Sequence, residues 1–171
     1  MNQEFACETD YNIKAFAAMA KALRKTIRKK KSRSSHIFGW IVAVLGIVSL
    51  AAWEVNRVTL AALIVLIPFL LFEDWINGFV GKKKNLPGAE HCSCRFYPDR
   101  FIAVTGIGKT EFGYDRIQYV TEDAGYFVFI INEKRAQAYD KKKLTGGTCA
   151  EFRKWIEERT GLSVVSLSGR L

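Results

Sequence analysis

Two long apolar stretches dominate the pattern of hydrophobic and polar positions in the first half of the chain. Residues 34–53 contain no Asp, Glu, Lys or Arg, and a second uncharged run, 58–72, continues to Val80 after two acids. At 1.5 Å per residue the first run spans roughly 30 Å, the thickness of a bilayer's hydrocarbon core. Because a short loop separates the runs, we predict an antiparallel transmembrane helical hairpin over residues 34–80.

Basic residues flank this predicted hairpin on both sides. Residues 21–33 contain eight Lys or Arg and no acid, and the connecting loop has a single Arg. Positively charged flanks stay in the cytoplasm, so we predict a multi-pass membrane protein with both termini cytoplasmic. A cleaved signal peptide is disfavoured, because a second apolar run follows the first. The candidate contacts for anionic lipid headgroups are Lys29, Lys30, Lys31, Lys82, Lys83 and Lys84.

Three residues in the second run interrupt its apolar character. Pro68 lacks a backbone donor, so we expect a bend there. Buried acids in a membrane mark ion paths, but Glu73 and Asp74 lie near the cytoplasmic end, and we expect no polar residue to face them from the first run. The tryptophans near the predicted span ends, where indole rings suit the interface, are Trp40, Trp53 and Trp75.

Residues 1–33 are expected to form a short strand followed by a basic amphipathic helix. Thr9 or Asp10 caps the helix start, and apolar residues recur at steps of three and four from Ile13 to Ile27. Two alternatives follow for the apolar stripe. It lies among the headgroups of the anionic leaflet, or it packs on the soluble domain.

After a basic linker, residues 81–89, the pattern changes to short strands separated by turn residues. The predicted strands are 91–97, 100–105, 110–114, 117–121, 126–132 and 137–140, with a hairpin turn at 106–109 and a final segment, 164–167, that is either an edge strand or a tail. Such spacing is typical of an antiparallel sheet or small barrel. Thr148 and Glu151 form a capping box, which predicts a helix to about Arg159 that stops at Gly161. The predicted fold is therefore a membrane α-helical hairpin plus an α+β domain, 90–171, in which a C-terminal helix caps a small antiparallel β-sheet or barrel.

Several phrases in this domain carry a resemblance to a known family. They are FYPDRF at 96–101, YDRIQYVTE at 114–122 with the spacing Tyr-x-x-Ile-x-x-Val-x-Glu, and YFVFI at 126–130. Together with the order of basic helix, hairpin and final helix, they make the chain similar to the bacterial YcxB-like family. The resemblance implies a protein of the bacterial inner (plasma) membrane, of unknown biochemical function, whose cytoplasmic domain is pleckstrin-homology-like (PH-like). The chain departs from the family's pattern at 139–143.

Charge narrows the classes of partner. The chain has 171 residues and a net charge of +9, but residues 1–36 alone contain nine Lys or Arg and three acids. This excess beside the hairpin argues against nucleic acid as a partner and favours a bilayer with anionic headgroups. On the soluble domain, the candidate contacts for a ligand or partner are Lys141, Lys142 and Lys143.

Residues that carry chemistry are few. Cys7, Cys92, Cys94 and Cys149 fall on the predicted cytoplasmic side, so we expect reduced thiols. The sequence His91-Cys92-Ser93-Cys94, with Cys7 as a third thiolate if the N-terminal strand joins the sheet, lacks the C-x₂-C pairs typical of zinc sites, so we expect apolar packing.

Catalytic patterns are also missing from the sequence. Neither His36 nor His91 is placed to act as the base for a cysteine nucleophile, and the glycines of 106–109 lack the length of a phosphate-binding loop. Glu122 and Asp123 are expected to solvate a turn. We predict no enzyme, no catalytic residue, no cofactor and no metal.

The predicted function is that of a membrane-anchored, non-enzymatic binding or regulatory protein with an unidentified protein partner, which an edge strand or groove would recognise. An immunity or envelope-stress protein is one alternative. A component of a small oligomeric transporter is a second, motivated by Pro68, Glu73 and Asp74. Formation of a homo-oligomer stays open.

Overall fold

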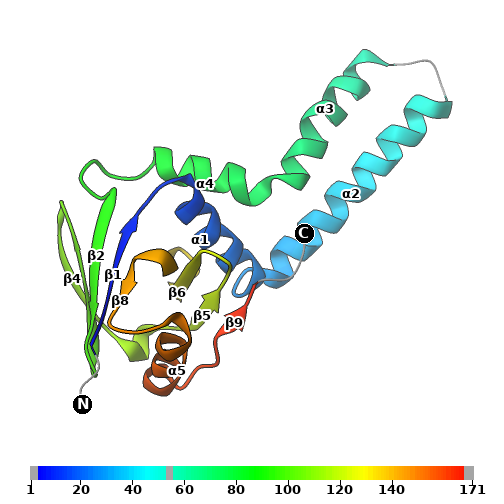
Figure 1. Ribbon diagram of the computed structural model, residues 1–171. Helices are drawn as coiled ribbons and strands as arrows, with labels where there is room; N and C mark the ends of the chain where they lie inside the picture. Colours follow the sequence, from blue (N-terminus) through cyan, green and yellow to red (C-terminus); the bar gives the residue numbers. More distant parts are fainter. Residues whose placement is uncertain (1–3, 53–55, 168–171) are drawn as a thin grey trace.

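The computed structural model describes residues 4–52 and 56–167, which form a β-rich domain and a projecting pair of helices (Figure 1). The helices are α1 (Ile13–Lys25), α2 (Lys29–Ala52), α3 (Arg57–Leu71), α4 (Glu73–Lys83) and α5 (Cys149–Thr160). The strands are β1 (Phe5–Asp10), β2 (His91–Phe96), β3 (Arg100–Thr105), β4 (Gly108–Gly113), β5 (Tyr119–Glu122), β6 (Tyr126–Asn132), β7 (Arg135–Asp140), β8 (Leu144–Thr145) and β9 (Val165–Ser166). Short 3₁₀ turns, η1 (Tyr114–Arg116) and η2 (Lys141–Lys143), precede β5 and β8.

The strands form two sheets, and no closed barrel is present among the described residues. The first sheet has the order β4-β3-β2-β1-β8, and the second has the order β7-β6-β5-β9. All neighbours are antiparallel except β5 and β9, which pair in parallel. The predicted antiparallel sheets and the edge strand near the C-terminus are therefore confirmed, whereas the barrel alternative is not.

The N-terminal strand β1 belongs to the interior of the first sheet. It pairs with β2 along its whole length, from Phe5 opposite Phe96 to Asp10 opposite His91, and with β8 on its other side. The folded β-rich unit therefore extends beyond the 90–171 boundary expected from the sequence and includes residues that precede the apolar runs.

The core lies between the two sheets and is closed by α5. Phe96 of the first sheet packs edge-on against Phe129 of the second, with ring centroids 5.9 Å apart, and against Phe152 of α5 at 4.9 Å. All three side chains are fully buried. The capping box fixes the start of α5, since the Thr148 hydroxyl accepts from the Glu151 amide at 3.2 Å while the Glu151 carboxylate accepts from the Thr148 amide at 2.7 Å.

Helix α1 covers the outer face of the second sheet. Its Ala15, Ala18, Met19 and Ala22 are buried against Val128 and other residues of β6 and β7. The small alanines let the helix approach the sheet closely, so packing on the domain is confirmed over the headgroup alternative. The packing of α1 on the second sheet also explains the nearly continuous apolar run of β6, because alternate side chains of this strand face the inter-sheet core and α1.

Helices α2 and α3 lie side by side and project from the domain (Figure 1); we call this pair the helical arm. Gly46 of α2 allows close contact, since a Cβ there would lie 3.1 Å from a methyl group of Leu63. Most other apolar side chains of the arm are exposed; Leu45 and Val65 are 63% and 70% exposed. Trp53 and the first two residues of the predicted loop, Glu54 and Val55, lie outside the described residues.

The second apolar run is not one continuous helix, which corrects the expectation of a single span to Val80. It breaks at Phe72, and α3 and α4 make an angle of 83°. The helical hydrogen bond from the Phe72 amide to the Pro68 carbonyl, 2.9 Å, shows that α3 continues past the proline before it ends. Helix α4 then turns onto α1, and Gly78 lies directly against the α1 backbone. Packing on α1, and not Pro68 alone, therefore decides where the chain bends.

Of the described helices, α2 is the one that is long and apolar enough to cross a membrane by itself. The pair α3 and α4 meets the same criteria only when the two are taken together as a broken span. The structure thus gives one candidate membrane helix and one bent companion.

Candidate functional site

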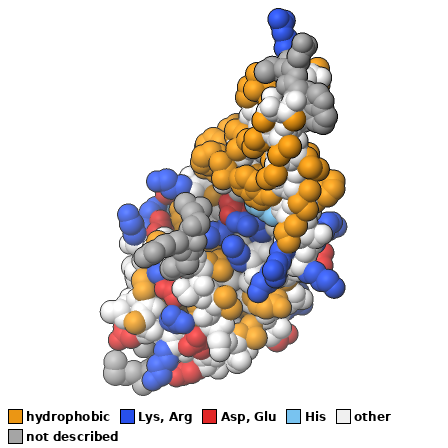
Figure 2. Space-filling model, turned by 90° about the vertical axis from the view of Figure 1, so that its right-hand side faces the viewer, with side chains coloured by type: hydrophobic (Ala, Val, Ile, Leu, Met, Phe, Trp, Pro, Cys, Tyr) orange, Lys and Arg blue, Asp and Glu red, His pale blue; other side chains and the backbone are white. Residues whose placement is uncertain are grey.

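The lysines predicted to contact anionic lipid lie where the helical arm meets the domain. Lys29, Lys30 and Lys31 form the first turn of α2. Lys82 and Lys83 end α4, and Lys84 follows as its C-cap; all six side chains are exposed. Figure 2 shows Lys and Arg side chains gathered at the base of the apolar arm. Segments far apart in the sequence thus form one basic zone.

A cavity of about 530 Å³ opens within this zone, between α1, the start of α2, α4 and the β6–β7 turn. We call it the basal cavity. Its lining is of mixed chemistry: the residues are Phe16, Met19, Ala20, Leu23, Arg24, Arg28, Ser32, Glu73, Asn77, Val80, Gly81, Lys84, Lys134 and Ala136. Of the six lysines predicted at the membrane surface, Lys84 alone lines it, while Lys29 and Lys30 line a second hollow of about 570 Å³ at the start of α2.

The acids near the break between α3 and α4 are paired, contrary to the expectation that nothing polar faces them from the first run. His36 of α2 lies with its Nε2 2.5 Å from Glu73 Oε2. Arg24 of α1 binds Asp74 through two guanidinium nitrogens, one of them Nε at 2.7 Å from Oδ1, and its Nε is 3.8 Å from Glu73. These contacts join α1, α2 and α4 at the base of the arm and neutralise Arg24.

Three other cations at the basal cavity have no carboxylate partner among the described residues. They are Arg28, Lys84 and Lys134. The Arg28 guanidinium donates to the carbonyl of Glu133, which places it beside Lys134 in the β6–β7 turn. The cavity therefore carries an excess of positive charge at its mouth.

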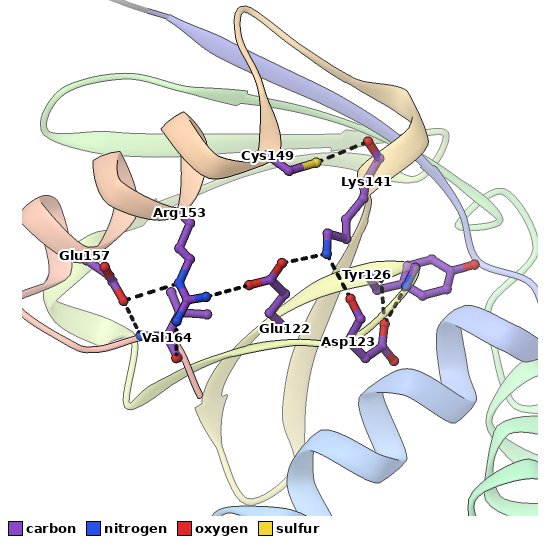
Figure 3. Close-up of polar contacts among 9 residues, drawn as sticks. Glu122, Asp123, Tyr126, Lys141, Cys149, Arg153, Glu157 and Val164 are labelled. Carbon is purple, nitrogen blue, oxygen red and sulfur yellow. Dashed lines mark hydrogen bonds and ion pairs between the residues drawn. The ribbon is translucent and has the colours of Figure 1, made fainter. Parts of the chain in front are cut away.

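The lysine cluster of the soluble domain divides into different roles. Lys141 is only 17% exposed; its ammonium donates to Glu122 Oε1 at 2.6 Å and to the Asp123 carbonyl at 2.9 Å (Figure 3). Lys143 pairs with Asp10 at 2.6 Å, and Lys142 is exposed. Lys141 therefore holds the fold together, and partner contact stays a prediction for Lys142 and Lys143.

Glu122 is the residue whose role sequence reasoning missed. It does not simply solvate a turn: besides Lys141 it pairs with Arg153 of α5 at 3.4 Å, and Arg153 in turn donates to the carbonyl of Val164 (Figure 3). This network ties β5, α5 and the C-terminal strand together. Asp123 does lie in the turn, where its carboxylate accepts from the amides of Gly125 and Tyr126.

A signal for Glu122 was present in the phrase Tyr-x-x-Ile-x-x-Val-x-Glu. Tyr114 is buried and its hydroxyl donates to the carbonyls of Tyr97 and Arg100, at 2.8 and 3.1 Å. Ile117 and Val120 are buried in the inter-sheet core. The phrase thus places three core residues and one network carboxylate, which is an architectural role.

The cysteines offer no metal centre among the described residues. Cys7, Cys92 and Cys94 are buried in the first sheet, and no group of His, Cys, Asp and Glu in the described part of the chain has metal-binding geometry. Burial raises the pKa of Cys7 to about 12 and also raises the pKa of Cys94. These thiols are held in the neutral form and act as small apolar side chains.

Fold and site together define an α+β domain with a projecting apolar helical arm and a basic cavity at its base. A model of the family described as YcxB-like protein matches residues 96–157, from the end of β2 into α5, so over this segment the chain is similar to the YcxB-like family. The match confirms the resemblance seen in the sequence and leaves β1, α1, the arm and α4 outside it. No curated protein and no solved structure matches the chain.

Proposed function

We propose that this chain is a membrane-anchored, non-enzymatic binding or regulatory protein. The helical arm spans the bacterial inner membrane, and the α+β domain, a PH-like module, is held at its cytoplasmic face. The observation that carries the proposal is the arm itself, whose apolar side chains project into solvent while basic residues surround its base. Exposed apolar surface of this extent is typical of a membrane or partner contact.

The bend at Phe72 supports this placement. Helix α3 is 15 residues long, so it covers roughly 22 Å at 1.5 Å per residue, less than a full hydrocarbon core. Helix α4 then leaves the arm at 83° and exposes Trp75 and Phe79, whose rings stack 6.1 Å apart. Exposed aromatic rings followed by lysines are typical of a helix lying in the interface, so α4 would lie along the cytoplasmic surface.

Orientation is tested by cysteine accessibility in intact cells. In a Cys149→Ser background, Asn56→Cys at the tip of the arm should react with a membrane-impermeant maleimide from outside, whereas Lys154→Cys on α5 should react only after the cells are lysed. Labelling of Lys154→Cys in intact cells would overturn the proposed topology.

The binding role is tested with the full chain, since β1 and α1 complete the domain. Exposed Lys142 is the candidate partner contact, and Lys154 is an exposed lysine on α5 that serves as its matched control. Partners captured from solubilised membranes should include one whose recovery falls in Lys142→Glu and persists in Lys154→Glu. Equal recovery in both variants would remove Lys142 from the binding surface.

A component of a small oligomeric transporter, motivated by Pro68, Glu73 and Asp74, stays the second alternative. The two acids pair with His36 and Arg24 at the base of the arm, so a transport path through them would have to break these contacts.

A further inference from the structure

The basal cavity has walls of two kinds, one apolar and one basic. Phe16, Met19 and Leu23 of α1, together with Ala136 and Val80, supply apolar surface, and Val80 is 42% exposed. Arg28, Lys84 and Lys134 supply positive charge from three separate segments of the chain. A ligand that matches both walls must have an anionic group and an apolar part.

The positive charge is available for a ligand. Arg24 is neutralised by Asp74, and Glu73 is paired with His36, so these groups satisfy one another. Arg28, Lys84 and Lys134 have no carboxylate within ion-pair distance in the described part of the chain. Arginine and lysine arranged around an opening in this way suit a phosphate group, which arginine binds through two parallel hydrogen bonds and lysine as a point charge.

The position of the cavity selects the source of that phosphate. Ser32, near the start of α2, lines the cavity, and from Ile37 onward the same helix carries no charged residue and exposes most of its large apolar side chains. A ligand with its phosphate at the cavity mouth can therefore place long hydrocarbon chains along the arm. A free anion would leave the apolar wall in contact with water.

We infer that the basal cavity binds the phosphate headgroup of an anionic phospholipid, with Arg28 and Lys134 as the principal contacts and Lys84 as a third. The inference deepens the proposed function, because it assumes that the arm lies in a bilayer. The lipid would join α1, α4 and the β6–β7 turn, and so fix how the domain sits beneath the membrane.

The test titrates the full chain, purified in a neutral detergent, with fluorescent phosphatidylglycerol and, separately, with phosphatidylcholine. Arg28→Gln/Lys134→Gln should weaken phosphatidylglycerol binding by about 10-fold. The matched control, Lys109→Gln/Arg116→Gln, removes the same charge from exposed residues of β4 and η1 that do not line the cavity, and should change binding by less than about 2-fold. Both pairs are exposed, so neither change should unfold the domain.

A variant that keeps the charge tests the apolar wall. Ala20→Leu fills part of the cavity and should weaken phosphatidylglycerol binding without altering the basic residues.

Equal weakening by the two charge variants, or none by either, would overturn the inference. So would competition by inorganic phosphate at equal concentration, which would identify a site for free anions. These titrations do not depend on the topology of the chain. If they fail while the cysteine labelling gives the expected result, the lipid site is rejected and the proposed membrane anchor is retained.

Discussion

Helix α4 approaches α1 closely because residue 78 is a glycine, so adding a side chain at this position tests the packing of the two helices. A Cβ at Gly78 would lie 2.7 Å from the amide nitrogen of Ala17 and 2.7 Å from the carbonyl oxygen of Ile13. Both atoms belong to the backbone of α1, so no side chain can rotate away. Gly78→Ala therefore forces the two helices to separate by about 0.7 Å to reach an ordinary contact of 3.4 Å.

The expected cost follows from opposing effects. Overpacking against rigid neighbours costs about 1–3 kcal/mol, and alanine regains about 1 kcal/mol over glycine through helix propensity. Because this clash is with backbone, we expect an overpacking cost near the upper end of that range. The net loss in the free energy of unfolding is then about 2 kcal/mol. For a chain of this length that loss lowers the Tm by about 4–8 °C.

The assay is thermal unfolding of the full chain in detergent, followed by tryptophan fluorescence, with hydrogen exchange of the α1 amides as a local readout. Gly81→Ala, one turn along α4, is the matched control, since its Cβ would meet only the movable ring of Phe16, at 3.0 Å. Gly78→Ala should unfold at a lower temperature than Gly81→Ala and exchange its α1 amides faster. A Tm for Gly78→Ala equal to or above that of the control would refute the packing described for α4.

Two further predictions concern the domain. Burial raises the pKa of Cys7 from its ordinary value of 9.0 to about 12, so the stability gained by keeping this thiol neutral is complete below pH 9 and is lost as the pH rises toward 12. At pH 8, iodoacetamide should therefore modify half-buried Cys149 well before Cys7. Equal rates of modification by mass spectrometry would contradict the burial of Cys7. Glu122→Gln removes the carboxylate shared by Lys141 and Arg153 and should lower the free energy of unfolding, measured by chemical denaturation, by about 1–3 kcal/mol. The control Glu111→Gln breaks an exposed pair with Arg100 and should lower it by under about 1 kcal/mol. Equal losses would show that the network adds nothing beyond a surface ion pair.

Local signals along the chain predicted much of the β-rich domain. The capping box at Thr148 predicted the start of α5, and Gly161 predicted its end. Both features satisfy backbone groups at a helix end whatever the rest of the fold does. The hairpin turn after β3 and the pairing of β5 with β6 also follow from nearby residues, and both are confirmed. The turn takes residues 106–107 of the predicted 106–109, because β4 begins at Gly108.

Features that depend on distant segments escaped prediction. The apolar stripe of α1 fits a lipid surface and a sheet equally well, and only the outward side chains of β6 and β7 decide between them. The break at Phe72 depends on contact with α1, which lies more than forty residues earlier in the chain. The basal cavity draws its cations from three such segments, so neighbouring residues give no sign that Arg28 and Lys134 meet.

The interior position of β1 has a consequence for biogenesis. This strand is synthesised first, yet its partners β2 and β8 leave the ribosome only after the whole helical arm has been made. The first sheet therefore has to close around a strand that has waited unpaired, with Phe5 and Cys7 uncovered. In the proposed arrangement, the apolar helices are delivered to the membrane during this wait. Insertion would thus come before completion of the domain, and a chain whose arm fails to insert would present an open sheet edge to the quality-control machinery of the cell.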